Sequence, residues 1–194
     1  MARPREFDID AALESAMQTF WARGYEATSV DDLCDSTNLG RSSFYAAFGD
    51  KRNLYLRALD RYEQRAATRL ADALSARLPI RKALSAFLDR IIGEIVSGPG
   101  RRGCFIGNCA AELPRGDREA ASQVRRSLDR VEKVFREAFT RARARGEING
   151  GSDVTALSRF FTAGIQGLRL VGKANPDRKA LEDIARTMLL TLDP

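Results

Sequence analysis

The sequence predicts an all-α protein of about nine helices. Three observations predict it: apolar residues recur at helical spacing in almost every segment, no segment alternates apolar and polar residues for long, and turns rich in glycine or proline separate the segments. Hydrophobic residues make up 44% of the chain and charged residues 30%, as in ordinary globular proteins. No apolar run is long enough to span a membrane and the N-terminus lacks the apolar stretch of a signal peptide, so we expect a cytoplasmic location.

The predicted helices are separated by clear start and stop signals. The first begins near Ile9, carries one apolar stripe and ends at Gly24. A short second helix covers residues 28–36, with Thr28 as its predicted N-cap and acidic residues in its first turn. The remaining predicted helices cover residues 40–47, 51–77, 80–97, 104–113, 117–145, 153–172 and 177–191.

The residue types argue against several classes of function. The chain has no histidine, which is the commonest general base and metal ligand, and it shows neither a nucleophile motif nor a metal-binding cluster. We therefore expect no enzyme activity, no metal and no cofactor. The segment GPGRRG (98–103) has the spacing of a dinucleotide fingerprint, but a helical pattern rather than a strand precedes it. We expect a loop there, in which Arg101 and Arg102 are available to an anionic ligand.

Charge is unevenly distributed along the chain. The net charge is +6, yet residues 1–50 have a local balance of −5, residues 51–77 have +4 and the remainder has +7. Binding of DNA by the N-terminal end therefore depends on where a few charges point. The acidic side chains that need to lie away from the phosphates are Glu6, Asp8, Asp10, Glu14, Asp31 and Asp32.

Residues 38–51, NLGRSSFYAAFGDK, combine three aromatic residues with a run of small polar ones. Two short helices joined by a turn of three or four residues have the geometry that places the second helix in a DNA major groove. Phe44 and Phe48 lie one helical turn apart and would anchor this helix to its neighbours. The residues left to face DNA are Arg41, Ser42, Ser43 and Tyr45, which suit base edges and phosphates. Periodicity alone leaves a second interpretation open, a helical hairpin whose aromatics only form core.

Residues 9–56 resemble the TetR family of bacterial transcriptional repressors. The matching positions are Phe20, Gly24, Tyr25, Thr28, Ser29, Val30, Leu33, Leu39, Phe44, Tyr45, Phe48 and Lys51. About ten spaced agreements make this pattern specific, and the rest of the chain resembles the family only in architecture. The resemblance implies a helix-turn-helix DNA-binding domain in residues 1–50 and a helical effector-binding and dimerisation domain in residues 51–194.

The resemblance also implies roles for individual residues at the DNA. The implied DNA contacts are Arg3, Arg5, Thr28, Arg41, Ser42, Ser43, Tyr45 and Lys51. Thr28 would cap the second helix and contact a phosphate, Lys51 would grip the backbone, and the N-terminal arginines would lie in the minor groove. Gly40 and Ser42 depart from the family pattern, which usually has a small hydroxyl residue at the first position and often glycine at the second, so the operator sequence stays open.

In the second domain, the resemblance places an effector pocket among the fourth to eighth helices. The candidate pocket residues are Tyr62, Phe87, Ile91, Cys104, Phe105, Asn108, Phe135, Phe160, Phe161 and Gln166. The last two helices are expected to form a homodimer, with Gly164 and Gly167 permitting close approach. The candidate dimer residues are Leu168, Val171, Ile184 and Met188.

The segment GCFIGNCAAEL (103–113) contains two of the three cysteines and resembles the sixth helix in one branch of the family. On an ideal helix, the Cα atoms of Cys104 and Cys109 would lie about 8.6 Å apart, too far for a disulfide. A helix N-terminus and the adjacent Arg101 and Arg102 favour a thiolate at Cys104. Two interpretations stay open: Cys104 is a reactive thiol that senses electrophiles or oxidants, or it is a small buried apolar side chain.

The sequence thus predicts a dimeric repressor of the TetR type. It would bind a palindromic double-stranded operator and be released by an unknown small-molecule effector or a thiol-reactive signal. The alternative is a helical small-molecule-binding protein that has lost DNA binding, which Gly40 and the local negative charge support.

Overall fold

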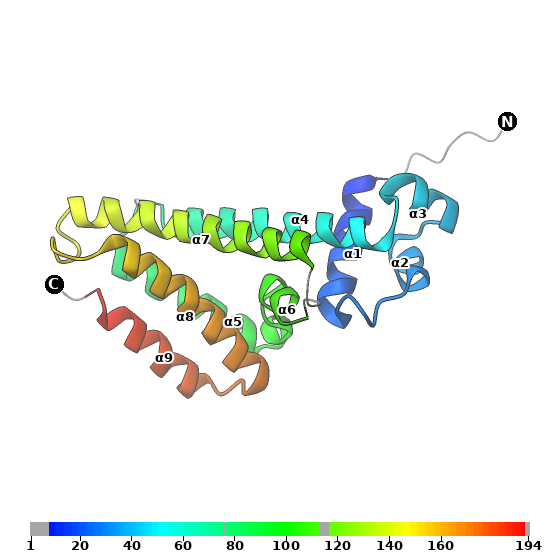
Figure 1. The fold of residues 1–194 in the computed structure, drawn as a ribbon. Helices are drawn as coiled ribbons and strands as arrows, with labels where there is room; N and C mark the ends of the chain where they lie inside the picture. Colours follow the sequence, from blue (N-terminus) through cyan, green and yellow to red (C-terminus); the bar gives the residue numbers. More distant parts are fainter. Residues whose placement is uncertain (1–7, 76, 113–116, 193–194) are drawn as a thin grey trace.

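The computed structural model describes residues 8–75, 77–112 and 117–192, and it confirms the all-α prediction (Figure 1). Those residues form nine α-helices and one 3-10 turn, without a strand. The helices are α1 (Ile9–Arg23), α2 (Val30–Thr37), α3 (Arg41–Phe48), α4 (Lys51–Ala73), α5 (Ile80–Val96), α6 (Phe105–Glu112), α7 (Arg118–Ala144), α8 (Val154–Ala174) and α9 (Arg178–Leu190). The predicted DNA contacts Arg3 and Arg5 lie outside the described residues.

The start of α2 differs from the prediction. Ser29 is the N-cap: its hydroxyl accepts a hydrogen bond from the Asp32 backbone N–H at 3.0 Å, and the Asp32 carboxylate accepts one from the Ser29 N–H at 2.8 Å. This reciprocal pair is a capping box. Thr28 is fully buried, and its hydroxyl donates to the Gly24 carbonyl oxygen at 2.6 Å. The predicted capping role of Thr28 is therefore wrong.

A sharp turn joins α2 to α3, as the sequence predicts. Asn38 adopts the left-handed conformation with φ of 55°, which asparagine tolerates better than most residues. Leu39 is buried in the turn, and Gly40 is the N-cap of α3, which therefore has no side-chain capping hydrogen bond. Phe44 and Phe48 are both buried, with ring centroids 5.8 Å apart. These rings fix α3 to the core that α1, α2 and α4 share.

The long helix α4 connects two hydrophobic cores. Its first half contributes Leu54, Tyr55, Leu59 and Tyr62 to an N-terminal core, whereas Leu70 belongs to a C-terminal core with α5 and α7–α9. Helices α4 and α7 run side by side along the molecule (Figure 1). The buried side of α6 also packs into the N-terminal core. The two cores therefore meet at α6 and the middle of α4.

Two glycines let neighbouring segments pack closely on the end of α5. A Cβ at Gly100, in the 3-10 turn η1 (Pro99–Arg102), would lie 2.7 Å from the backbone nitrogen of Ile95. A Cβ at Gly172 in α8 would lie 2.7 Å from Ile95 Cγ2. Close packing explains Gly100 in the GPGRRG segment, where we expected a loop and the chain forms a packed 3-10 turn.

Candidate nucleic-acid interface and effector pocket

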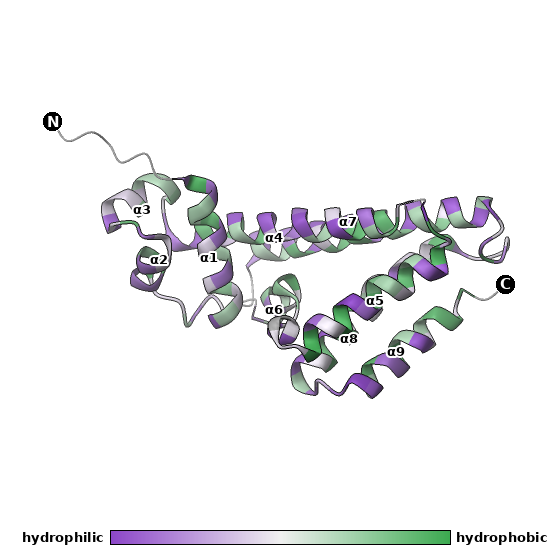
Figure 2. Ribbon diagram, turned by 180° about the vertical axis from the view of Figure 1, so that it is seen from behind, coloured by the Kyte–Doolittle hydropathy of each residue, from purple (hydrophilic) through white to green (hydrophobic). Residues whose placement is uncertain are grey.

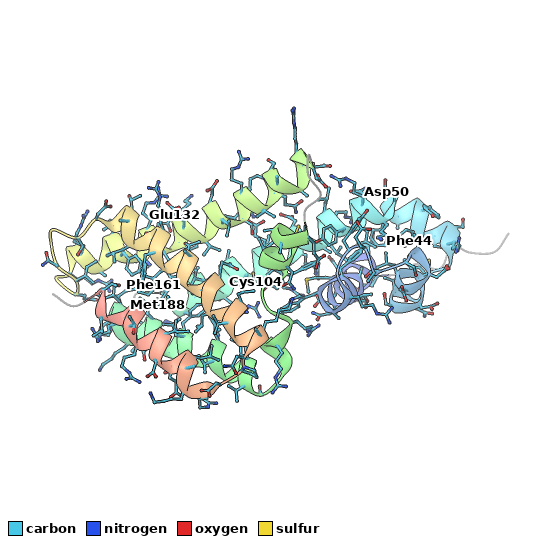
Figure 3. The ribbon with its side chains drawn as sticks, turned by 60° about the horizontal axis from the view of Figure 1, so that its bottom comes forward. Phe44, Asp50, Cys104, Glu132, Phe161 and Met188 are labelled. Carbon is cyan, nitrogen blue, oxygen red and sulfur yellow. The ribbon has the colours of Figure 1, made fainter. Side chains whose placement is uncertain are left out.

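Helix α3 presents its polar residues outward. Ser42 and Ser43 are exposed, and Tyr45 is 46% exposed, while the rings of Phe44 and Phe48 hold the helix from behind. The Tyr45 ring meets Phe44 edge-on at 5.4 Å, so its body is supported and its hydroxyl end is accessible. Figure 3 shows Phe44 in this N-terminal part of the molecule. The helix has the shape and chemistry of a DNA-reading helix.

Arg41 begins α3 and is held by an acidic residue of α2. Its Nε and Nη2 donate to the Asp31 carboxylate at 2.9 and 2.8 Å, and this bidentate pair raises the pKa of Arg41. Both side chains are 64% exposed. Asp31 therefore lies directly beside Arg41, one of the predicted DNA contacts.

Other acidic residues of the N-terminal part have structural partners. Asp8 caps α1 and Asp32 caps α2, where Arg23 also donates to it. These hydrogen bonds, first those from Ser29 and then that from Arg23, lower the pKa of Asp32 to about 2. Asp10 and Glu14 pair with arginines of α4. Their charge is thereby partly balanced within the protein.

Lys51 and Thr28 lie near the start of α4 and α2 but differ in access. The Lys51 Nζ lies 4.3 Å from the centroid of the Tyr25 ring, and its side chain is half-buried. Thr28 is 0% exposed and its hydroxyl is occupied by Gly24. Lys51 can therefore reach solvent, whereas Thr28 presents no hydroxyl to DNA in this structure.

A pocket of about 60 Å³ lies among α4, α5, α6, α7 and α8. It holds five of the predicted pocket residues: Tyr62, Phe87, Ile91, Cys104 and Gln166. It also contains charged and polar side chains that the sequence analysis missed: Glu63, Arg69, Arg90, Glu94, Ser127 and Arg169. Arginines at helical spacing are indistinguishable in sequence from an ordinary solvated helix face, so no clear signal pointed to them.

Four predicted pocket residues lie elsewhere. Phe105 is buried in the N-terminal core, with its ring edge-on to Tyr55 and Tyr62. Phe135 and Phe161 are buried in the C-terminal core, 5.8 Å apart. Asn108 braces a loop: its Nδ2 donates to the Arg102 carbonyl oxygen at 2.8 Å and its Oδ1 accepts from Lys173 at 3.1 Å.

A fifth candidate, Phe160, also falls outside the pocket. Phe160 lies on the outer side of α8 and is 43% exposed. Aromatic residues at neighbouring positions of one helix thus have different environments, Phe161 in the core and Phe160 at the surface.

Cys104 lies just before α6 and lines the pocket, in the middle of the molecule (Figure 3). It is half-buried, and the Tyr62 hydroxyl donates to its sulfur at 3.8 Å. Cys34 and Cys109 are buried instead, and burial raises the pKa of both thiols. All three cysteines are free. Cys104 is therefore the thiol that a small reagent in the pocket can meet.

Helix α6 and the segments flanking it touch the DNA-binding part directly. The Glu112 carboxylate at the end of α6 accepts from the Tyr25 backbone N–H at 3.2 Å. Arg102, before α6, donates to Gln18 Oε1 at 2.9 Å, and its guanidinium lies 4.5 Å from the Trp21 ring. A shift of α6 would therefore disturb contacts with α1 and with the loop that precedes α2.

A second junction joins α4 to the start of α7. Arg52 donates to both carboxylate oxygens of Asp117, at 2.6 and 2.7 Å, and to Glu119 at 3.2 Å. Asp117 also caps α7 by accepting from the Ala120 N–H at 3.0 Å. The hydrogen bonds from Arg52, and next that from Ala120, lower the pKa of Asp117 to about 2.

Helix α8 contains both apolar and polar residues (Figure 2), and its apolar residues lie on one buried face and one exposed face. Leu168 and Met188 were predicted at a dimer interface, but both are buried in the C-terminal core, and Figure 3 shows Met188 near Phe161. That prediction is wrong for these two residues. Val171 is 40% exposed and Ile184 is half-buried. The outer face of α8 exposes Phe160, Ala163, Gly167, Leu170 and Val171.

Two further features, membrane-spanning helices and metal sites, were sought among the described residues. None of their helices combines the length and apolar character that a membrane span requires. In the same part of the chain, no group of three or more cysteine and acidic side chains is arranged to hold a metal ion.

The fold and the outward face of α3 together define a helix-turn-helix regulator with a second, helical domain around a small pocket. A family model described as "Bacterial regulatory proteins, tetR family" matches residues 12–58, and one described as "Tetracyclin repressor-like, C-terminal domain" matches residues 80–188. The chain therefore belongs to the TetR family of bacterial regulatory proteins.

Two full-length relatives and two solved structures illustrate the similarity. The chain is 34% identical to the HTH-type transcriptional repressor ComR of Escherichia coli over 188 residues, covering 96% of this chain and 90% of that one. It is 29% identical to the uncharacterized HTH-type regulator YezE of Bacillus subtilis over 194 residues, covering 100% of both. A cysteine-substituted variant of the TetR family regulator CifR, complexed with 26-bp operator DNA, matches with a TM-score of 0.87 and 27% identity over 98% of this chain and 100% of that one. The reduced form of Escherichia coli NemR has the same fold, with a TM-score of 0.85 and 17% identity over 95% of this chain and 97% of that one.

Proposed function

We propose that this chain is a homodimeric transcriptional repressor. It binds a palindromic operator through α3 and releases it when a small molecule fills the pocket or a thiol-reactive signal modifies Cys104. The observation that carries the proposal is that α3 has one buried and one exposed face. Two buried phenylalanines hold the helix, and the exposed residues are Arg41, Ser42, Ser43 and Tyr45. The similarity to CifR, whose structure contains operator DNA, supports binding of operator DNA by this chain.

The outer face of α8 supports a dimer. Apolar side chains and Gly167 lie there in one stripe, and a Cβ at Gly167 would meet no atom within 4 Å, so a partner helix has room to approach. A two-fold axis through this face relates two copies of α3. This symmetry requires a palindromic operator. Half-sites one turn of DNA apart are separated by about 34–36 Å.

Release is proposed to run through α6. The pocket and Cys104 lie at one end of this helix, and Glu112 at the other end holds the backbone of Tyr25. A ligand changes operator binding only by its different affinity for the bound and released states. A coupling free energy of about 1–3 kcal/mol would weaken operator binding about 5- to 150-fold.

Selection from random duplex DNA tests the proposal. We expect the wild-type protein to enrich a palindrome, and Arg41→Ala and Tyr45→Ala to lose that enrichment, because each removes a contact to bases or phosphates. Ser122→Ala, on α7 and far from α3, is the control and should enrich the same palindrome. Absence of enrichment by the wild-type protein, even at low salt, would favour the alternative of a small-molecule binder without DNA binding.

Mild alkylation of the native protein tests the thiol signal. Cys104 should be modified first, since it lines the pocket, whereas Cys34 and Cys109 should react only after unfolding, since both are buried. Mass spectrometry of peptides from treated native protein gives the site. The Cys104→Ser variant is the control, and it should keep operator binding after treatment. An unmodified Cys104 under these conditions would end the sensor hypothesis.

A further inference from the structure

Three arginines surround the pocket without an acidic partner. Arg69 comes from α4, Arg90 from α5 and Arg169 from α8, and within the described residues none of them forms an ion pair. The Arg90 guanidinium carbon lies 5.3 Å from the centroid of the Phe87 ring. Three arginines from three different helices, each without an ion pair among the described residues, thus gather around one pocket.

The acidic residues at the pocket do not balance these arginines. Glu63 is only 2% exposed, and its Oε1 lies 2.9 Å from Nε of Arg130, an arginine on α7 outside the pocket lining. Burial raises the pKa of the Glu63 carboxyl group, while Arg130 opposes that rise. Glu94 is the one remaining acidic residue of the lining. Three arginines against one carboxylate leave an excess of positive charge.

One of the arginines acts on the interior of the pocket. Burial raises the pKa of the Tyr62 hydroxyl, and the positive charge of Arg169 opposes this rise. Arg169 is half-buried, whereas Arg69 and Arg90 are exposed. Arg169 is therefore the least exposed of the three arginines, and its charge acts on Tyr62 in the pocket wall.

The rest of the pocket is apolar and small. Its apolar lining residues are Ala66, Leu70, Phe87, Ile91, Ile106, Leu128, Val131 and Ile165. A volume of about 60 Å³ corresponds to about four to six water molecules. A fitting ligand thus has a short apolar body and a head group that binds arginine. Arginine recognises carboxylates through paired N–H donors and a full positive charge.

We propose that the effector of this protein is a small amphipathic carboxylate, bound non-covalently with its head on Arg169 and Arg90 and its apolar body among α4, α5 and α8. The regulatory meaning of this site depends on the repressor function proposed above. Binding of the carboxylate itself does not, because it can be measured without DNA.

Calorimetric titration of the full chain with straight-chain carboxylates of two to eight carbons tests the proposal. We expect saturable binding, and at least about tenfold weaker binding of the alcohol and the amine of equal length, because neither supplies a negative head group. The fluorescence of Trp21 gives a second measure of binding. Trp21 is the one tryptophan of the chain, and the centroid of its ring lies 5.0 Å from that of Tyr62, which lines the pocket.

Variants assign the binding to the arginines. Arg169→Gln and Arg90→Gln should each weaken carboxylate binding about tenfold or more, by loss of a charge-assisted hydrogen bond. Arg125→Gln changes an exposed arginine of α7 that does not line the pocket, and should bind as the wild type does. Arg90 is exposed, so its replacement is not expected to disturb folding.

Three results would overturn the proposal. They are no binding at any chain length, stronger binding of the amine, and carboxylate binding that neither arginine variant weakens. A carboxylate that binds as expected to a protein without any operator would leave this inference standing and refute only the repressor function. A protein that selects an operator but binds no carboxylate would refute the ligand class alone.

Discussion

Phe44→Ala is expected to lower the free energy of unfolding by about 3–5 kcal/mol and to abolish operator binding, because it empties the centre of the N-terminal core. Phe44 is 0% exposed and meets Phe48 and the shared core of α1, α2 and α4. Without its ring, α3 loses the contact that fixes its orientation. Urea unfolding followed by circular dichroism measures the stability, and fluorescence anisotropy with the selected operator measures the binding.

Its neighbour Tyr45 provides the matched control. Tyr45 is 46% exposed, so Tyr45→Ala should change stability by less than about 1 kcal/mol yet weaken operator binding about tenfold or more. Tyr45→Phe removes only the hydroxyl and separates a phosphate contact from a ring contact. If Phe44→Ala were as stable as wild type, or if Tyr45→Ala bound the operator normally, the division between anchoring and reading side chains in α3 would be wrong.

Asp117→Ala is expected to cost about 2–3 kcal/mol of stability at pH 7. It removes the N-cap of α7, worth about 1 kcal/mol, and leaves Arg52 without its closest partner at the junction with α4. Asp117→Asn keeps a capping side chain and loses only the charge, so its cost should be about 1–2 kcal/mol, allowing for solvent screening of the half-exposed arginine. Chemical denaturation at pH 7 measures both variants.

The same pair predicts how stability depends on pH. The pKa of Asp117 is about 2 in the folded protein, below its ordinary value of 3.8, so its ionised form favours the folded state. This stabilisation is complete above about pH 4 and is lost as the pH falls from about 4 to about 2. Asp117→Asn should flatten this part of the stability profile. Asp129→Asn, an exposed carboxylate of the same helix, should change stability by less than about 0.5 kcal/mol, and an equal effect of both substitutions would contradict the assignment.

Local signals in the sequence were sufficient for the helices and for the anchoring of α3. The spacing of Phe44 and Phe48 fixes which side of a helix is buried, whatever else surrounds it. The error at Thr28 came from choosing between two adjacent hydroxyl residues. The spacing Ser29-x-x-Asp32 is itself a capping signature and would have identified Ser29 correctly.

The second domain was harder to predict because its helices have more than one apolar face. In α8, Phe160 and Phe161 are neighbours in sequence, yet one is exposed and the other is in the core. Periodicity shows that a residue is apolar at helical spacing, but the choice between core, pocket and partner surface depends on helices distant in sequence. Leu168, Met188, Phe135 and Phe161 were misplaced for that reason. The sequence did not point to the pocket arginines for a related reason: the helices that carry them become neighbours only in the folded chain.

With Arg41 in the role at the DNA proposed above, its ion pair with Asp31 would disfavour binding to arbitrary DNA on a chromosome. A repressor competes with about 10⁶ or more non-specific sites, where affinity comes almost entirely from phosphates. An arginine that already has a carboxylate partner gains less from an arbitrary phosphate than an unpaired one, and the Asp31 carboxylate repels the backbone. Exchanging Asp31 for DNA is favourable only at a site where the contacts of Arg41 are stronger than its ion pair with Asp31. The ion pair thus lowers the fraction of protein held on the wrong sequences and leaves more of it for the operator.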